Sequence, residues 1–194
     1  MHRNVRPLSQ RRGDILIIAF FLLNLCFITY MVDFEQLVIA DPLHFTYPIW
    51  PPPFMVDLVH WWGRTFDPLL MARPVWWKVT ILFDAVFFGP YYAAAIYAYA
   101  RGKEWIRMPS IIHASMLFTV TTIIVFEEIY GPYRSPQLPI VLAANAPWII
   151  FPIFITLRMW RAPYPFTVTA GPRDDRTPIR TAMVSAETSS VHSA

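Results

Sequence analysis

Four apolar runs, each long enough to cross a lipid bilayer, constrain this chain more than any other feature. They cover residues 15–33, 77–100, 106–127 and 138–160. A helix of about 20 apolar residues spans the hydrocarbon core of a membrane. The chain has 194 residues, of which 56% are hydrophobic and 15% are charged, and it is too apolar for a soluble domain of this length. We therefore predict an all-α membrane protein built as a bundle of four transmembrane helices.

The sequence divides into a basic tail at residues 1–12, a membrane domain at 13–165 and a polar tail at 166–194. The first apolar run follows two arginines, as a secretory signal would. It is longer than a usual signal core and no small-residue cleavage site follows it, so we interpret it as a helix. The polar tail is expected to be disordered. The long first loop is rich in aromatic residues, and residues 54–62 predict a short amphipathic helix that lies in the membrane interface or covers the bundle.

Lysine and arginine residues are distributed unequally between the two sides of the predicted bundle. Twelve lie on the side of the termini: four in the first tail, three after the second run and five after the fourth run. The opposite side carries four. Because positive loops stay on the cytosolic side, we predict that both termini are cytosolic. The basic residues form no dense patch, so we expect no nucleic-acid partner.

Asp84 lies inside the second apolar run, where an ionisable side chain costs a few kcal/mol. The alternating direction of the helices places other polar residues at a similar depth, in the lumenal half of the bundle. These residues must face inward to avoid lipid, and we expect them to converge on one chamber with Tyr91 and Trp148 in its wall. The polar members of this set are Asp33, Asp84, Thr119, Thr121, Thr122 and Asn145.

Such a chamber favours two kinds of ligand. Two carboxyls close together in a low dielectric repel each other, and a cationic amine would relieve that repulsion through a charge-assisted hydrogen bond. Aromatic walls add cation–π attraction. A rigid apolar ligand with one polar end, such as a sterol, also fits.

Structural roles are the alternative for each of these residues. Asp33 could cap a helix end, and Asp84 could form a hydrogen bond that serves only the fold. Thr121 and Asn145 could join neighbouring helices, and Trp148 could simply pack in the core.

Several short motifs, in the same order along the chain, resemble the sigma-2 receptor (transmembrane protein 97) family, within the wider group that shares the EXPERA domain with emopamil-binding protein. The resemblance covers roughly residues 11–165. The motifs are Met31-Val-Asp33, Phe66-Asp-Pro-Leu-Leu70, Leu82-Phe-Asp84, Lys103-Glu-Trp-Ile-Arg-Met-Pro109, Phe126-Glu127, Ala146-Pro147 and Arg161-Ala-Pro-Tyr164.

This resemblance implies an endoplasmic-reticulum membrane protein with an intramembrane pocket for sterols, other lipids or cationic amphiphiles. Asp33 matches the aspartate that contacts the amine, and Asp84 matches an acid, usually a glutamate, that hydrogen-bonds to it. Asp67 matches an aspartate that organises the first loop. For ligand binding we thus expect Asp33, Asp84, Tyr91, Thr121, Asn145 and Trp148, with Asp67 in a structural role.

Two functions remain open at this point. One is a non-enzymatic binding protein in sterol and lipid homeostasis, or in handling mitochondrial precursors at the reticulum surface as in the efficient mitochondria targeting-associated relatives. It needs no catalytic residue, metal or cofactor, and a homodimer is compatible with it. The other is a sterol isomerase that shifts a ring double bond, for which Asp84, Asn145 and Trp148 would supply the polar groups. The isomerase has a histidine where this chain has Thr80.

Overall fold

The computed structural model describes residues 3–169. Four helical rods in this part of the chain are long and apolar enough to cross a membrane. Their bounds are Arg12–Val38, Val75–Arg101, Glu104–Tyr130 and Leu138–Trp160. The predicted four-helix membrane architecture is confirmed.

The first two rods change helix type along their length. The first consists of α1 (Arg12–Leu23), the π-helical segment η2 (Asn24–Asp33) and α2 (Phe34–Val38). The second consists of α5 (Val75–Phe83), the π-helical segment η3 (Asp84–Phe88) and α6 (Gly89–Arg101). The third and fourth are simpler: the short 3₁₀ turn η4 (Glu104–Ile106) leads into α7 (Arg107–Tyr130), and α8 is Leu138–Trp160.

Pro90 accounts for part of the irregularity in the second rod. Proline has no backbone N–H, so the π-type hydrogen bond from residue 90 back to Ala85 cannot form. The Ala85 carbonyl instead accepts a hydrogen bond from the Tyr30 hydroxyl at 3.3 Å. The π segment of the second rod is therefore tied directly to that of the first.

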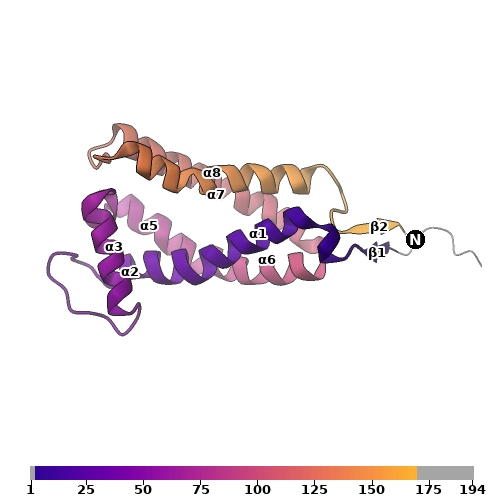
Figure 1. Cartoon of the computed structure of the whole chain (residues 1–194), viewed down its shortest axis with the longest axis horizontal. Coiled ribbons are helices and arrows are strands. Elements are labelled where there is room, and N and C mark those ends of the chain that lie inside the picture. The colour runs from indigo at the N-terminus through magenta and orange to yellow at the C-terminus, as the bar shows by residue number, and fades with distance from the viewer. Residues whose placement is uncertain (1–2, 170–194) are drawn as a thin grey trace, which may run out of the picture.

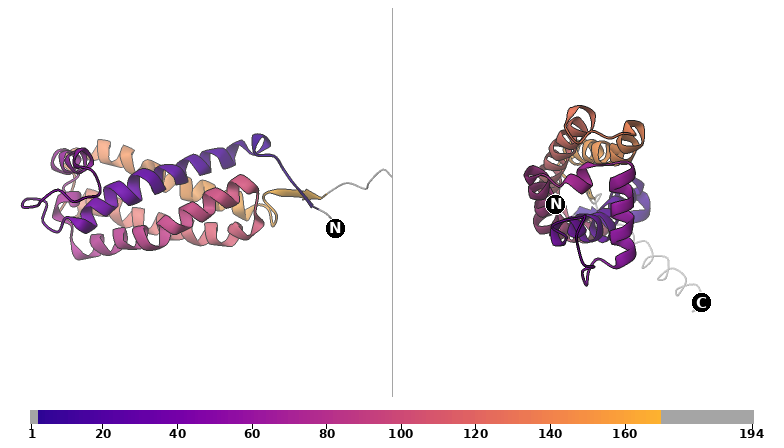
Figure 2. Two further views of the ribbon diagram at one scale, coloured as in Figure 1. Left: turned by 90° about the horizontal axis from the view of Figure 1, so that it is seen from below. Right: turned by 90° about the vertical axis from the view of Figure 1, so that its left-hand side faces the viewer.

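The four rods lie along the long axis of the molecule (Figures 1 and 2). Helices α7 and α8 form an antiparallel hairpin, and α1 packs against α6. The main core lies between these layers and is mostly aromatic and aliphatic. Its fully buried members include Ile17, Phe21, Tyr92, Tyr99 and Ile155.

One end of the bundle, which we call the strand end, gathers both described ends of the chain. Strand β1 (Arg3–Val5) pairs antiparallel with β2 (Thr167–Thr169), and the short turn η1 (Leu8–Gln10) follows β1. The expected disorder of the second tail is therefore wrong for residues 167–169, because their backbone is paired with the first tail. Residues 170–194, the rest of that predicted tail, lie outside the described residues.

The opposite end, which we call the loop end, carries two short helices, α3 (Pro53–Thr65) and α4 (Leu69–Ala72). Helix α3 lies across this end of the bundle (Figure 1). It buries Met55, Val56 and Val59 and exposes Phe54 and Trp61, as an amphipathic helix does. The predicted amphipathic helix in the first loop is confirmed.

A buried ion network anchors the loop end. Arg73 contacts both carboxylate oxygens of Glu35, at 3.0 and 2.9 Å, and its guanidinium also donates to the carbonyls of Ile39 and Leu70. His60 of α3 lies 2.9 Å from the same carboxylate. The network thus joins α2, α3 and the segment before α5, although residues 35 and 73 are far apart in sequence.

Candidate functional site

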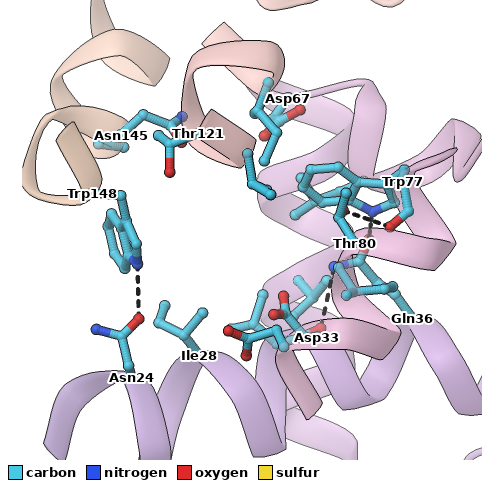
Figure 3. Close-up of a pocket in the computed structure, with 18 of the residues that line it drawn as sticks. Asn24, Ile28, Asp33, Gln36, Asp67, Trp77, Thr80, Thr121, Asn145 and Trp148 are labelled. Carbon is cyan, nitrogen blue, oxygen red and sulfur yellow. Dashed lines mark hydrogen bonds between the residues drawn. The ribbon is translucent and has the colours of Figure 1, made fainter. Parts of the chain in front are cut away.

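A cavity of about 460 Å³ lies between the four rods and α3. Its volume is within the range of pockets that hold drug-sized ligands. Most of its wall is apolar, from residues such as Ile28, Leu117 and Ile124. Polar groups enter it at a few places only, which Figure 3 shows.

Asp33 and Asp84 form the principal acidic group of the cavity wall. Asp33 ends η2, Asp84 begins η3, and their carboxyls are neighbours that influence each other's ionisation. Asp84 also accepts hydrogen bonds from the hydroxyls of Thr29 and Tyr92, the latter at 3.4 Å. No lysine, arginine or histidine among residues 3–169 forms an ion pair with either carboxyl.

A second polar group faces the cavity where α8 meets the first rod. The Trp148 indole N–H donates to the Asn24 side-chain oxygen at 2.8 Å (Figure 3). The Asn24 side-chain amide donates to the Phe20 carbonyl at 2.8 Å. Asn145, one turn before Trp148, donates to the Val141 carbonyl at 3.0 Å and also lines the cavity. These side chains are thus held by hydrogen bonds before any ligand enters.

Three cavity residues with hydrogen-bonding side chains were missed by the sequence analysis. The Trp77 indole N–H donates to the Gln36 side-chain oxygen at 2.7 Å, and both residues line the cavity. Asn24 was missed as well, although a polar amide inside an apolar run is the same kind of signal that identified Asp84. The first rod therefore supplies three polar side chains to the cavity, Asn24, Asp33 and Gln36.

Tyr91 does not line the cavity, contrary to the prediction. Its hydroxyl donates to Ser110 at 3.0 Å, and its ring stacks on His113. A π turn takes in about one more residue than an α turn, because its hydrogen bond spans five residues rather than four. The residue on the face of Asp84 is therefore Tyr92, eight positions on, rather than Tyr91, seven positions on.

Among the three threonines expected in the chamber, the cavity wall contains only Thr121. Thr119 and Thr122 lie on other faces of α7, and their hydroxyls donate to the carbonyls of Ser115 and Phe118 in their own helix. Helical spacing explains the difference, because residues 119 and 122 point about 160° and 100° away from residue 121.

Asp67 lies at the loop end of the cavity and also holds the backbone of α4. Its carboxylate accepts the Leu69 N–H at 3.2 Å, and its own N–H donates to the Trp62 carbonyl. Burial raises the pKa of this carboxyl. Within residues 3–169, His, Cys, Asp and Glu side chains do not gather in groups of three that could hold a metal ion.

Comparison with known proteins gives the family that the sequence motifs resemble. The sequence model of the family described as EXPERA (EXPanded EBP superfamily) matches residues 54–159. The chain is 27% identical to Sigma intracellular receptor 2 of Homo sapiens and of Macaca fascicularis, over 81% of this chain and 93% of each of those proteins. It is 26% identical to the Xenopus tropicalis protein of that name, over 70% of this chain and 81% of that protein. The chain belongs to the EXPERA family, the expanded EBP superfamily.

Proposed function

We propose that this multi-pass membrane protein binds sterols or cationic amphiphiles in its intramembrane cavity. The observation that carries the proposal is the pair Asp33 and Asp84, two carboxyls at the wall of an apolar cavity with no cationic partner among residues 3–169. The named relatives, called intracellular receptors, are compatible with a ligand-binding role.

An amine suits the acidic group for electrostatic reasons. Two adjacent carboxyls in a low dielectric cannot both ionise without repelling each other. An ammonium group placed beside them would offset that repulsion. Its N–H groups would form charge-assisted hydrogen bonds with Asp33. The hydrogen bonds that Thr29 and Tyr92 donate to Asp84 support this arrangement, because they orient the Asp84 carboxyl, whereas neither hydroxyl is bonded to Asp33.

A sterol suits the remainder of the cavity. Its rings would contact the aliphatic and aromatic wall, and its single hydroxyl could hydrogen-bond to one of the acids or to the Asn145 amide. The neutral sterol would need no ionised carboxyl, so the two ligand classes should depend on Asp33 to different degrees.

We place the protein in the endoplasmic-reticulum membrane with both termini in the cytosol. The pairing of β1 with β2 supports one side for both termini, because it joins the two described ends at the strand end. The excess of basic residues at that end supports the cytosolic side. In this setting the protein would act in sterol and lipid homeostasis or in handling mitochondrial precursors at the reticulum surface.

The proposal is tested by measuring the affinity of the purified protein for a labelled monoamine amphiphile. Asp33→Asn should weaken binding by at least about 1.5 kcal/mol, or roughly tenfold, the scale of a hydrogen bond to a charged group. Asp41→Asn is the matched control, because Asp41 lies in the exposed part of the first loop. Unchanged amine affinity in a folded Asp33→Asn protein would refute the acidic site.

Isomerisation of a sterol double bond is the second candidate. It is favoured by one observation: Asp84, Asn145 and Trp148 all border the same cavity, where an acid and a base could act on one ring system. Restored sterol synthesis in cells that lack their own isomerase would support this reaction. Failure to restore it, with the protein present in the membrane, would favour binding alone.

A further inference from the structure

Buried carboxyls in this structure differ in whether the protein supplies a cation for them. Asp14 at the strand end pairs with Arg11 at 2.7 Å and with Arg158 at 3.1 Å. Glu35 pairs with Arg73, as described above. A buried carboxylate is costly unless it is paired, and in both places the fold itself provides the partner.

Asp67 and Glu128 differ from Asp14 and Glu35, and resemble Asp33 and Asp84, in having no cationic partner among residues 3–169. Their exposed fractions are 5% and 1%, and their carboxyls lie against each other. Neither forms an ion pair within the described residues, and apart from the contact between the two carboxyls, the side-chain oxygens of Glu128 have no hydrogen-bond partner there. This second pair of acids therefore lacks the compensation that Asp14 and Glu35 receive.

Glu128 lies on the face of α7 that points to the cavity. Leu117, Thr121 and Ile124 line the cavity, and Glu128 continues their helical spacing by four residues toward the loop end. Asp67 and Trp62 are lining residues of the cavity, and Glu128, which is not one, adjoins it through Asp67. Figure 3 shows Asp67 and Asp33 on opposite sides of the cavity.

We propose that Asp67 and Glu128 form a second cation subsite, and that the cavity binds amphiphiles with two ammonium groups. This inference rests on the proposed function, since the first ammonium group would occupy the site at Asp33 and Asp84. The second group would lie at the loop end, where the indole of Trp62 adds cation–π attraction. The apolar wall between the two acidic pairs would contact the hydrocarbon spacer.

The test compares one monoamine amphiphile with a series of diamines that carry a second ammonium group at increasing distance along the same chain. In the wild-type protein, the best diamine should bind at least about tenfold more tightly than the monoamine, the effect of one further charged hydrogen bond. Glu128→Gln should bring this ratio close to one, because the amide keeps the shape and loses the charge. Glu127→Gln is the matched control on the neighbouring position, and it should preserve the ratio.

The outcomes separate this inference from the function on which it rests. If the wild-type protein binds the monoamine but prefers no diamine, or if the preference survives both Glu128→Gln and Asp67→Asn, the second subsite is refuted and the first site stands. If Asp33→Asn leaves monoamine binding unchanged, the proposed function fails whatever the diamine ratio. Should Glu128→Gln fail to fold, the wild-type comparison alone still decides whether a second ammonium group strengthens binding.

Discussion

Replacing Arg73 with methionine should destabilise the protein strongly. The side chain is 1% exposed and makes four close polar contacts, two to Glu35 and two to backbone carbonyls. Methionine retains the apolar stem and removes the guanidinium. Residue 73 has a φ of 47°, in the left-handed region, and methionine keeps the same backbone constraint. The change therefore isolates the charged group.

The expected loss of stability follows from the burial of the network. Removing one partner of a buried ion pair costs about 3–5 kcal/mol, because the other charge stays buried. Glu35 is fully buried and would retain only His60 as a neighbour on its carboxylate. At about 2–4 °C per kcal/mol for a protein of this size, the melting temperature should fall by roughly 10 °C.

Thermal unfolding of the detergent-solubilised protein, followed by tryptophan fluorescence, measures this loss. Arg64→Met is the control, since Arg64 is exposed at the end of α3 and should shift the melting temperature little. The double variant Glu35→Gln, Arg73→Met should be less destabilised than the sum of the two single variants. Equal effects of Arg73→Met and Arg64→Met would refute the inference that this network anchors the loop end.

Three further outcomes are expected. Trp148→Phe should lower stability by about 1–3 kcal/mol, because it leaves the buried Asn24 carbonyl oxygen without its donor, and chemical unfolding would detect this. Burial raises the pKa of Asp67, so the folded state keeps a proton that the unfolded state loses as pH rises above about 4. Stability should therefore fall over that pH range, and melting curves of Asp67→Asn should show a smaller fall. Glycosylation tags at either terminus should stay unmodified in cells, whereas a tag in the exposed part of the first loop should be modified; modification of a terminal tag would reverse the proposed orientation.

The fold was largely predictable from the sequence because lipid imposes a simple rule on it. Long apolar runs must form helices, since apart from a closed β-barrel only a helix satisfies all of its backbone hydrogen bonds in a bilayer. An ionisable residue in such a run must face inward, and Asp84 does so. Ordered motifs such as Leu82-Phe-Asp84 also identified the family.

Contacts between distant residues were not predictable in the same way. The pairing of Glu35 with Arg73 depends on how the first loop folds back on the bundle, and no local pattern encodes it. Tyr91 was assigned to the cavity by α-helical spacing, and the π segment that begins at Asp84 turned Tyr92 toward the acid instead. Helix type changes the face that a residue occupies, and a hydrophobic pattern alone does not reveal a π segment.

Mapping where a photoreactive sterol attaches to the membrane-embedded protein tests the central claim most directly. Our account predicts labelled peptides that contain cavity residues of the first rod, α7 and α8, such as Ile28, Thr121 and Trp148. A monoamine amphiphile should displace this labelling in the wild-type protein and displace it much less in Asp33→Asn. Labelling confined to lipid-facing positions such as Ile123 and Ile150, unaffected by the amine, would contradict the existence of one intramembrane site for both ligand classes.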